Sequence, residues 1–126
     1  MAVSETGFRT FDDLGFIFTE AFVSAEQAAT AATTTTVAHG LSGAPKLIQV
    51  FTICKTAEFN YSIGDTLWVG TSFQNNSGLL PYIPNGDTTN VVLNTATTSQ
   101  SVHNKTTWGN STLTVGNWKF IIHAYY

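Results

Sequence analysis

Two long apolar stretches decide the fold class: residues 46–55, KLIQVFTICK, and residues 117–126, NWKFIIHAYY. Both are rich in β-branched and aromatic side chains, and a turn-forming residue (Pro45 or Gly116) precedes each one. Each stretch therefore predicts a β-strand. Apolar side chains occupy both alternating positions of residues 46–55, so we expect a central strand that is covered on both faces.

Shorter strand-like segments lie around these two stretches, and Gly or Pro residues punctuate the intervals between them. The segment 74–89, QNNSGLLPYIPNGDTT, contains two prolines and predicts a long loop that could make contacts. Many short strands in succession predict an all-β fold, specifically an antiparallel β-sandwich with an extended N-terminal arm. The further strands that we expect are Thr34–His39, Asp65–Phe73, Asn90–Thr95, Ser99–His103 and Ser111–Val115.

The composition is typical of a single β domain. The 126 residues suit one core, and only 10% of them are charged, whereas 21 are Thr and 9 are Asn. Thr favours extended backbone and presents a hydroxyl to water on an exposed strand face. Cys54 is the only cysteine, so no intramolecular disulfide can form, and we expect its side chain to be buried as a small apolar group.

The first part of the chain differs in character from the rest. Residues 1–24 carry five Phe among acidic residues, and residues 24–36, SAEQAATAATTTT, are small and polar. We therefore predict an N-terminal arm with an Ala/Thr-rich spacer at residues 1–32 and a sandwich domain at residues 33–126. The net charge is −4 over residues 1–26 and +1 over residues 27–126. We expect the arm to bind a partner through its aromatic side chains: Phe8, Phe11, Phe16, Phe18 and Phe22.

Motifs for catalysis are missing from the sequence. No phosphate-binding loop, dinucleotide fingerprint or nucleophile elbow occurs, and His39, His103 and His123 form no metal-binding pair. Glu58 and Asp65 flank a short loop, but nothing indicates a pocket that would perturb their pKa values. We predict that the protein is not an enzyme and that it uses no metal and no cofactor. The charge pattern also argues against a nucleic-acid partner, and no apolar run is long enough to predict a membrane span.

One region carries a more specific pattern. It includes residues 37–41, VAHGL, residues 54–58, CKTAE, and Tyr61-Ser62 followed by Gly64-Asp65. Together with Pro45, Gln49-Val50 and the closing aromatic strand, this pattern resembles a β-sandwich module of phage tail-fibre ends and other virion surface proteins. A more distant resemblance is to the trimeric H-type lectin sandwich. The match covers about a third of the chain. The sequence departs from the pattern at two places: Thr66 stands where an acidic residue is usual, and Ile122-His123 stands where an Arg is common.

The resemblance implies a homotrimer on a virion surface, assembled in the host cytoplasm. Two functions are compatible with it. The first is a capsid decoration (cement) protein, whose N-terminal arm docks on the major capsid protein. The second is a tail component, either a tail-fibre tip or a receptor-binding, lectin-like protein that recognises a host glycan. The chain begins at Met1 and has no shaft repeat or coiled-coil heptad, which favours decoration. We expect the last strand to supply the trimer interface, through Trp118, Phe120, Ile121 and Tyr125.

Overall fold

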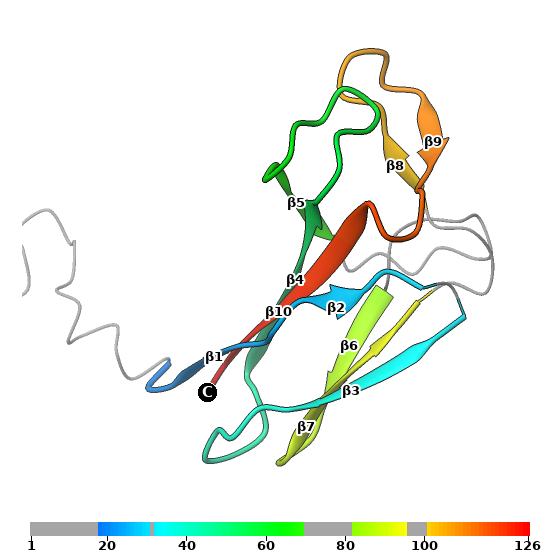
Figure 1. Ribbon diagram of the computed structural model, residues 1–126. Helices are drawn as coiled ribbons and strands as arrows, with labels where there is room; N and C mark the ends of the chain where they lie inside the picture. The colour runs from blue at the N-terminus through cyan, green and yellow to red at the C-terminus, as the bar shows by residue number, and fades with distance from the viewer. Residues whose placement is uncertain (1–17, 31, 70–81, 96–100) are drawn as a thin grey trace, which may run out of the picture.

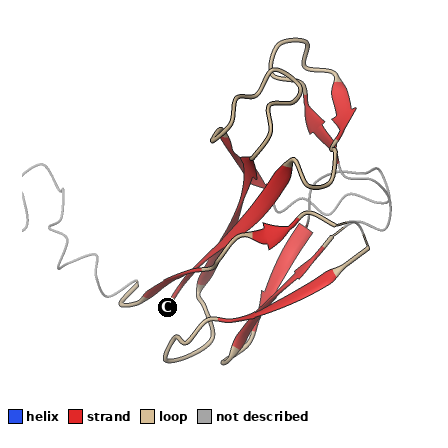
Figure 2. Cartoon of the chain, in the orientation of Figure 1, coloured by secondary structure: helices blue, strands red, loops and turns tan. Residues whose placement is uncertain are grey.

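The computed structural model describes residues 18–30, 32–69, 82–95 and 101–126. Within these ranges the secondary structure consists of ten strands, and no helix occurs among them (Figure 2). The pairings between these strands are antiparallel. The predicted all-β class is therefore confirmed. Residues 1–17, which include most of the predicted arm, lie outside the described residues.

The large sheet contains strands from both long apolar stretches, residues 46–55 and 117–126. Its order is β1 (Ala21–Val23), β10 (Trp118–Tyr125), β4 (Leu47–Cys54) and β5 (Thr66–Val69), and β2 (Gln27–Ala28) also pairs with β10. The last strand is thus an interior strand, bordered by β1 and β2 on one side and by β4 on the other (Figure 1). Eight residue pairs join β10 to β4, from Trp118 opposite Cys54 to Tyr125 opposite Leu47.

A smaller sheet lies against the large one and has the order β3 (Thr34–Ala38), β7 (Asn90–Asn94) and β6 (Tyr82–Gly86). A separate hairpin of β8 (Ser101–His103) and β9 (Asn110–Thr112) lies at one end of the molecule, beside the loop between β4 and β5 (Figure 1). Strand β6 falls inside the segment that the sequence predicted as a loop. The prediction was wrong there, because β6 pairs with the buried strand β7 although it contains Pro84.

The core lies between the two sheets and follows from strand alternation. In-register pairing of β10 with β4 brings alternate side chains of both strands to one face. On this face Trp118, Phe120 and Ile122 are fully buried, and they belong to one apolar cluster with Val91 and Leu93 of the small sheet. The opposite positions of both long strands face outward. Residues 46–55 are therefore covered by protein on one face, not on both as predicted.

Part of the predicted arm and spacer belongs to the large sheet. Strands β1 and β2 both pair with β10, and the Thr19 and Glu20 amides donate to the Tyr126 carbonyl at 2.6 and 3.0 Å. Ser24 is buried, and its Oγ accepts a hydrogen bond from the Ile122 amide at 2.9 Å. Ala29 is also buried, with 1% exposure. Small side chains allow this segment to lie against the core, so residues 19–30 are part of the sheet rather than a free spacer.

Candidate functional site

The outer face of the large sheet is the main exposed apolar surface among the described residues. We define the outer face as the outward positions of the paired strands together with Phe18. At these positions Trp68 is 74% exposed and Val23 is 57% exposed. Strand pairing brings them into rows, with Trp68 opposite Phe51 and Phe51 opposite Ile121. The outer-face residues are Phe18, Ala21, Val23, Ala28, Leu47, Gln49, Phe51, Ile53, Thr66, Trp68, Lys119, Ile121, His123 and Tyr125.

Aromatic contacts hold this face in one arrangement. The Phe51 ring lies 5.7 Å from the Trp68 ring and 4.7 Å from the His123 ring, both in edge-on geometry. The Phe18 ring lies 5.6 Å from that of Tyr125. Such pairs restrict side-chain rotation before any partner arrives, so a partner would lose less conformational entropy on binding here. Lys119 is the only Asp, Glu, Lys or Arg residue of the outer face.

The structure divides the predicted trimer-interface residues into two groups. Trp118 and Phe120 point into the sandwich core and have 0% exposure, so their side chains cannot contact a neighbouring copy. Ile121 and Tyr125 lie on the outer face and are partly exposed. The prediction was wrong for the first pair because β10 is an interior strand whose side chains alternate between core and outer face, and Trp118 and Phe120 occupy core positions.

The predicted arm residues are similarly divided. Phe22 packs against the core cluster and is only partly exposed, so it serves the sheet. Phe18 is 36% exposed at the margin of the outer face, next to Tyr125. Phe8, Phe11 and Phe16 lie outside the described residues. Of the two predicted arm phenylalanines that the structure describes, Phe18 and Phe22, only Phe18 is thus available to a partner.

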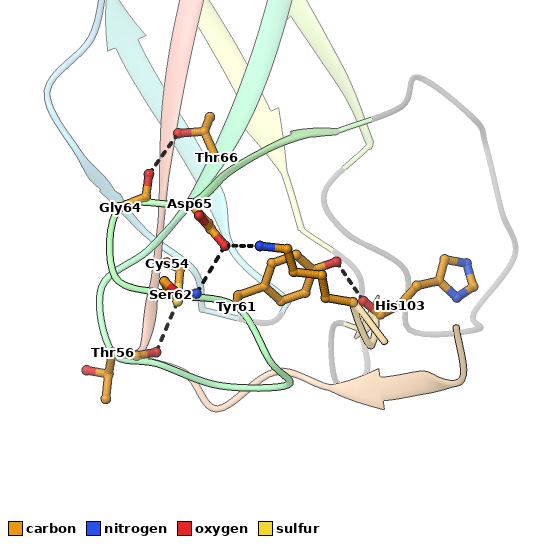
Figure 3. A network of polar contacts seen from close by, with 9 residues as sticks. Cys54, Thr56, Tyr61, Ser62, Gly64, Asp65, Thr66 and His103 are labelled. Atoms are coloured by element: carbon orange, nitrogen blue, oxygen red, sulfur yellow. Dashed lines mark hydrogen bonds and ion pairs between the residues drawn. The ribbon is translucent and has the colours of Figure 1, made fainter. Parts of the chain in front are cut away.

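A second surface lies at the end of the sandwich where two loops meet. We define this distal end as the β4–β5 loop, residues 55–65, and the β8–β9 hairpin, residues 101–112. The Tyr61 hydroxyl donates to the His103 carbonyl at 2.8 Å, and Lys105 pairs with Asp65 at 2.8 Å (Figure 3). The Asn60 side-chain amide donates to Asn104 Oδ1 at 3.0 Å. Several independent contacts therefore fix the hairpin to the loop.

Charge pairing at the distal end is reflected in the pKa values. The hydrogen bond from Lys105, followed by that from the Ser62 amide, lowers the pKa of Asp65. The same pair raises the pKa of Lys105. Because these charges compensate each other, the distal end carries no net charge from this pair. Both residues are solvated, so the pair positions the hairpin more than it stabilises the fold.

The residues considered for chemistry have structural roles. Glu58 accepts hydrogen bonds from Trp118 Nε1 at 2.6 Å and from the Thr114 amide and hydroxyl. His39 is buried, accepts from the Leu41 amide at 2.9 Å through Nδ1, and donates through Nε2 to the Asp87 carbonyl at 3.0 Å. Cys54 is buried as predicted, and burial raises the pKa of its thiol. These groups hold loops in place.

Two features are absent from the described part of the chain. No three His, Cys, Asp or Glu side chains there gather closely enough to hold a metal ion. Nor does that part contain a helix with the length and apolarity needed to cross a membrane. The outer face and the distal end both expose large apolar side chains, which makes each a candidate binding surface.

No protein-family model, curated protein or solved structure matches this chain.

The sequence indicated the outer face only indirectly. Apolar side chains at both alternating positions of residues 47–54 and 118–125 showed that each strand has a second apolar face. Trp68 and Val23 were not predicted as interface residues. Whether Trp68 and Val23 belong to the outer face depends on which strands border β4 and β10, and strand order is a property of the tertiary fold.

Proposed function

We propose that the protein is a structural component of a bacteriophage virion surface that associates with further copies of itself through the outer face. The observation that carries the proposal is an apolar, aromatic face extending across β1, β10, β4 and β5, with Trp68 and Val23 largely exposed in the single chain. Exposed apolar patches of this kind mark interaction surfaces, since leaving them in water is unfavourable.

The charge of the outer face supports a second copy as its occupant. A contact between two outer faces would bury few charges, since this face contains one Lys and no carboxylate at its outward strand positions. The two margins of the face differ, with Trp68 on β5 and with Val23 and Phe18 on the β1 side. Contact of one margin with the opposite margin of the next copy is heterologous, and such contacts form a ring when the rotation between copies closes and an open filament when it does not. The resemblance to phage modules favours a ring of three.

Within this proposal the preferred role is capsid decoration. The support is the resemblance together with the Phe-rich N-terminus, in which Phe8, Phe11 and Phe16 precede the first described strand. Phe18 itself lies at the margin of the outer face, with its ring 5.6 Å from that of Tyr125. Apolar side chains on such a segment could fill grooves on a major capsid protein. The alternative role is a tail-fibre tip or receptor-binding protein. The observation relevant to this role is Trp108 of the distal end, which is 76% exposed.

Light scattering on purified protein tests the self-association. We expect a trimer at micromolar concentration, and Trp68→Gln should shift it towards monomer. Val115→Gln is the matched control, because Val115 is 56% exposed but lies in the β9–β10 connection, outside the sheet. The proposal is wrong if the unmodified protein is a stable monomer, or if both variants change the mass equally.

Particle binding tests the virion role separately. The appropriate truncation removes residues 1–17 and leaves β1 and β2 in the sheet. The truncated protein should retain the trimer but should no longer decorate phage particles that lack the protein. Undiminished decoration would show that the N-terminus is not the attachment segment.

A further inference from the structure

We propose that the distal end contains a saccharide-binding site centred on the indole ring of Trp108. This site is separate from the outer face and does not depend on self-association. Trp108 is 76% exposed, the highest value among the large apolar side chains described as exposed. A side chain with this much exposure contributes little to folding, although it has the largest apolar surface of any residue type.

The backbone at Trp108 is in a conformation that a bulky residue rarely adopts. Its φ angle is 59°, in the left-handed region that favours glycine. Surrounding contacts impose this conformation: the Trp108 amide donates to the Asn104 carbonyl at 3.0 Å, and His103 Nδ1 donates to the Trp108 carbonyl at 3.1 Å. Strained positions that are held by their surroundings occur most often at binding sites. The indole is thus exposed on a backbone that hydrogen bonds hold in an unusual conformation.

The hairpin beneath the indole is rigid. Asn104 Oδ1 accepts hydrogen bonds from the Thr106 and Thr107 amides at 2.9 and 3.1 Å, and also from Asn60 of the facing loop. The Lys105 amide donates to the Phe59 carbonyl at 3.1 Å. A large ring on a pre-organised loop binds with little loss of conformational entropy, as aromatic anchors do in antibody loops.

The groups around Trp108 indicate the chemistry of the ligand. The exposed neighbours Thr106, Thr107 and Asn110 carry neutral hydroxyl and amide groups, and the Lys105 charge is compensated by Asp65. A flat apolar ring in a segment of exposed, neutral hydrogen-bonding residues suits a sugar, which presents a face of C–H bonds and a rim of hydroxyls. A nucleic-acid ligand would require uncompensated basic residues.

Nuclear magnetic resonance of the full chain gives a direct test. The three Trp residues give three indole N–H signals, of which Trp118 reports the core, Trp68 the outer face and Trp108 the distal end. A glycan array carrying hexoses and N-acetylhexosamines selects the probe, and the selected oligosaccharide is then titrated. We expect the Trp108 signal to shift with the ligand while the Trp118 signal stays in place.

The decisive variant is Trp108→Gly, because glycine adopts a φ of 59° without strain and the variant should fold at least as well. It should weaken binding of the selected oligosaccharide by about tenfold to a hundredfold, as the loss of one ring-stacking contact does elsewhere. Val115→Gln is the control and should leave the affinity unchanged, because Val115 lies outside both the distal end and the outer face. The proposal is overturned if no glycan binds, if Trp108→Gly binds as well as the parent, or if only a protein ligand shifts the Trp108 signal.

Discussion

Glu58 should be important for stability, because its carboxylate holds a donor inside the core. Trp118 has 0% exposure, and its Nε1–H donates to Glu58 Oε2 at 2.6 Å. The same carboxylate accepts from the amide and the hydroxyl of Thr114, in the connection that leads into β10. Glu58 thus joins the β4–β5 loop to the start of the last strand. Glu58→Ala removes every one of these acceptors.

The size of the expected stability loss follows from the hydrogen bond that Trp118 donates to Glu58. A hydrogen bond to a charged group contributes about 1.5–3 kcal/mol, and a buried donor left without a partner costs a similar amount in desolvation. Thr114 is exposed and can bond to water instead, so it adds little. We expect Glu58→Ala to lower the free energy of unfolding by about 2–3 kcal/mol. Glu58→Gln keeps a neutral acceptor in the same place and should cost about 1 kcal/mol.

Urea unfolding followed by circular dichroism measures both variants, and a double-mutant cycle with Trp118→Phe isolates the hydrogen bond. Phe has no N–H donor, so Glu58→Ala should cost much less in the Trp118→Phe background. A coupling energy of about 1.5 kcal/mol or more supports the assignment. If Glu58→Ala costs under about 0.5 kcal/mol, or costs the same in both backgrounds, the reasoning is refuted.

Three further predictions concern single side chains. Thr52 is fully buried, and its hydroxyl has no hydrogen-bond partner among the described residues. Thr52→Val should therefore raise the free energy of unfolding by about 1 kcal/mol, and a less stable variant in urea unfolding would contradict this. Cys54 should react slowly with a thiol reagent until the protein unfolds, and rapid labelling of native protein would contradict its burial. The pKa of Asp65 is lowered from 3.8, so its stabilising contribution is present above that pH and is lost as the pH falls through the folded value. Melting temperatures of the parent and Asp65→Asn should therefore differ at neutral pH and converge in acid, and a constant difference would contradict the assignment.

The sequence by itself determined the class of fold. Alternation along residues 47–54 and 118–125 requires extended strands with two distinct faces, because successive side chains of a strand point in opposite directions. The burial of Cys54 followed from its position in an apolar strand. Likewise, the spacing of Gly and Pro separated most of the strands, since turns have specific backbone requirements that only a few residue types meet.

The tertiary structure decided which apolar face became core and which became surface. Trp118 and Ile121 are both apolar residues of one strand, yet only Trp118 and its alternate neighbours face the small sheet, because strand order and register select a single inward side. The residues read as a spacer, 24–32, supply strand β2 and the buried side chains of Ser24 and Ala29. Backbone pairing depends on main-chain groups that every residue except proline carries in full, so it leaves only a weak trace in side-chain composition. The exposure of Trp108 is decided in the same way, by hydrogen bonds between two loops that lie far apart in the sequence.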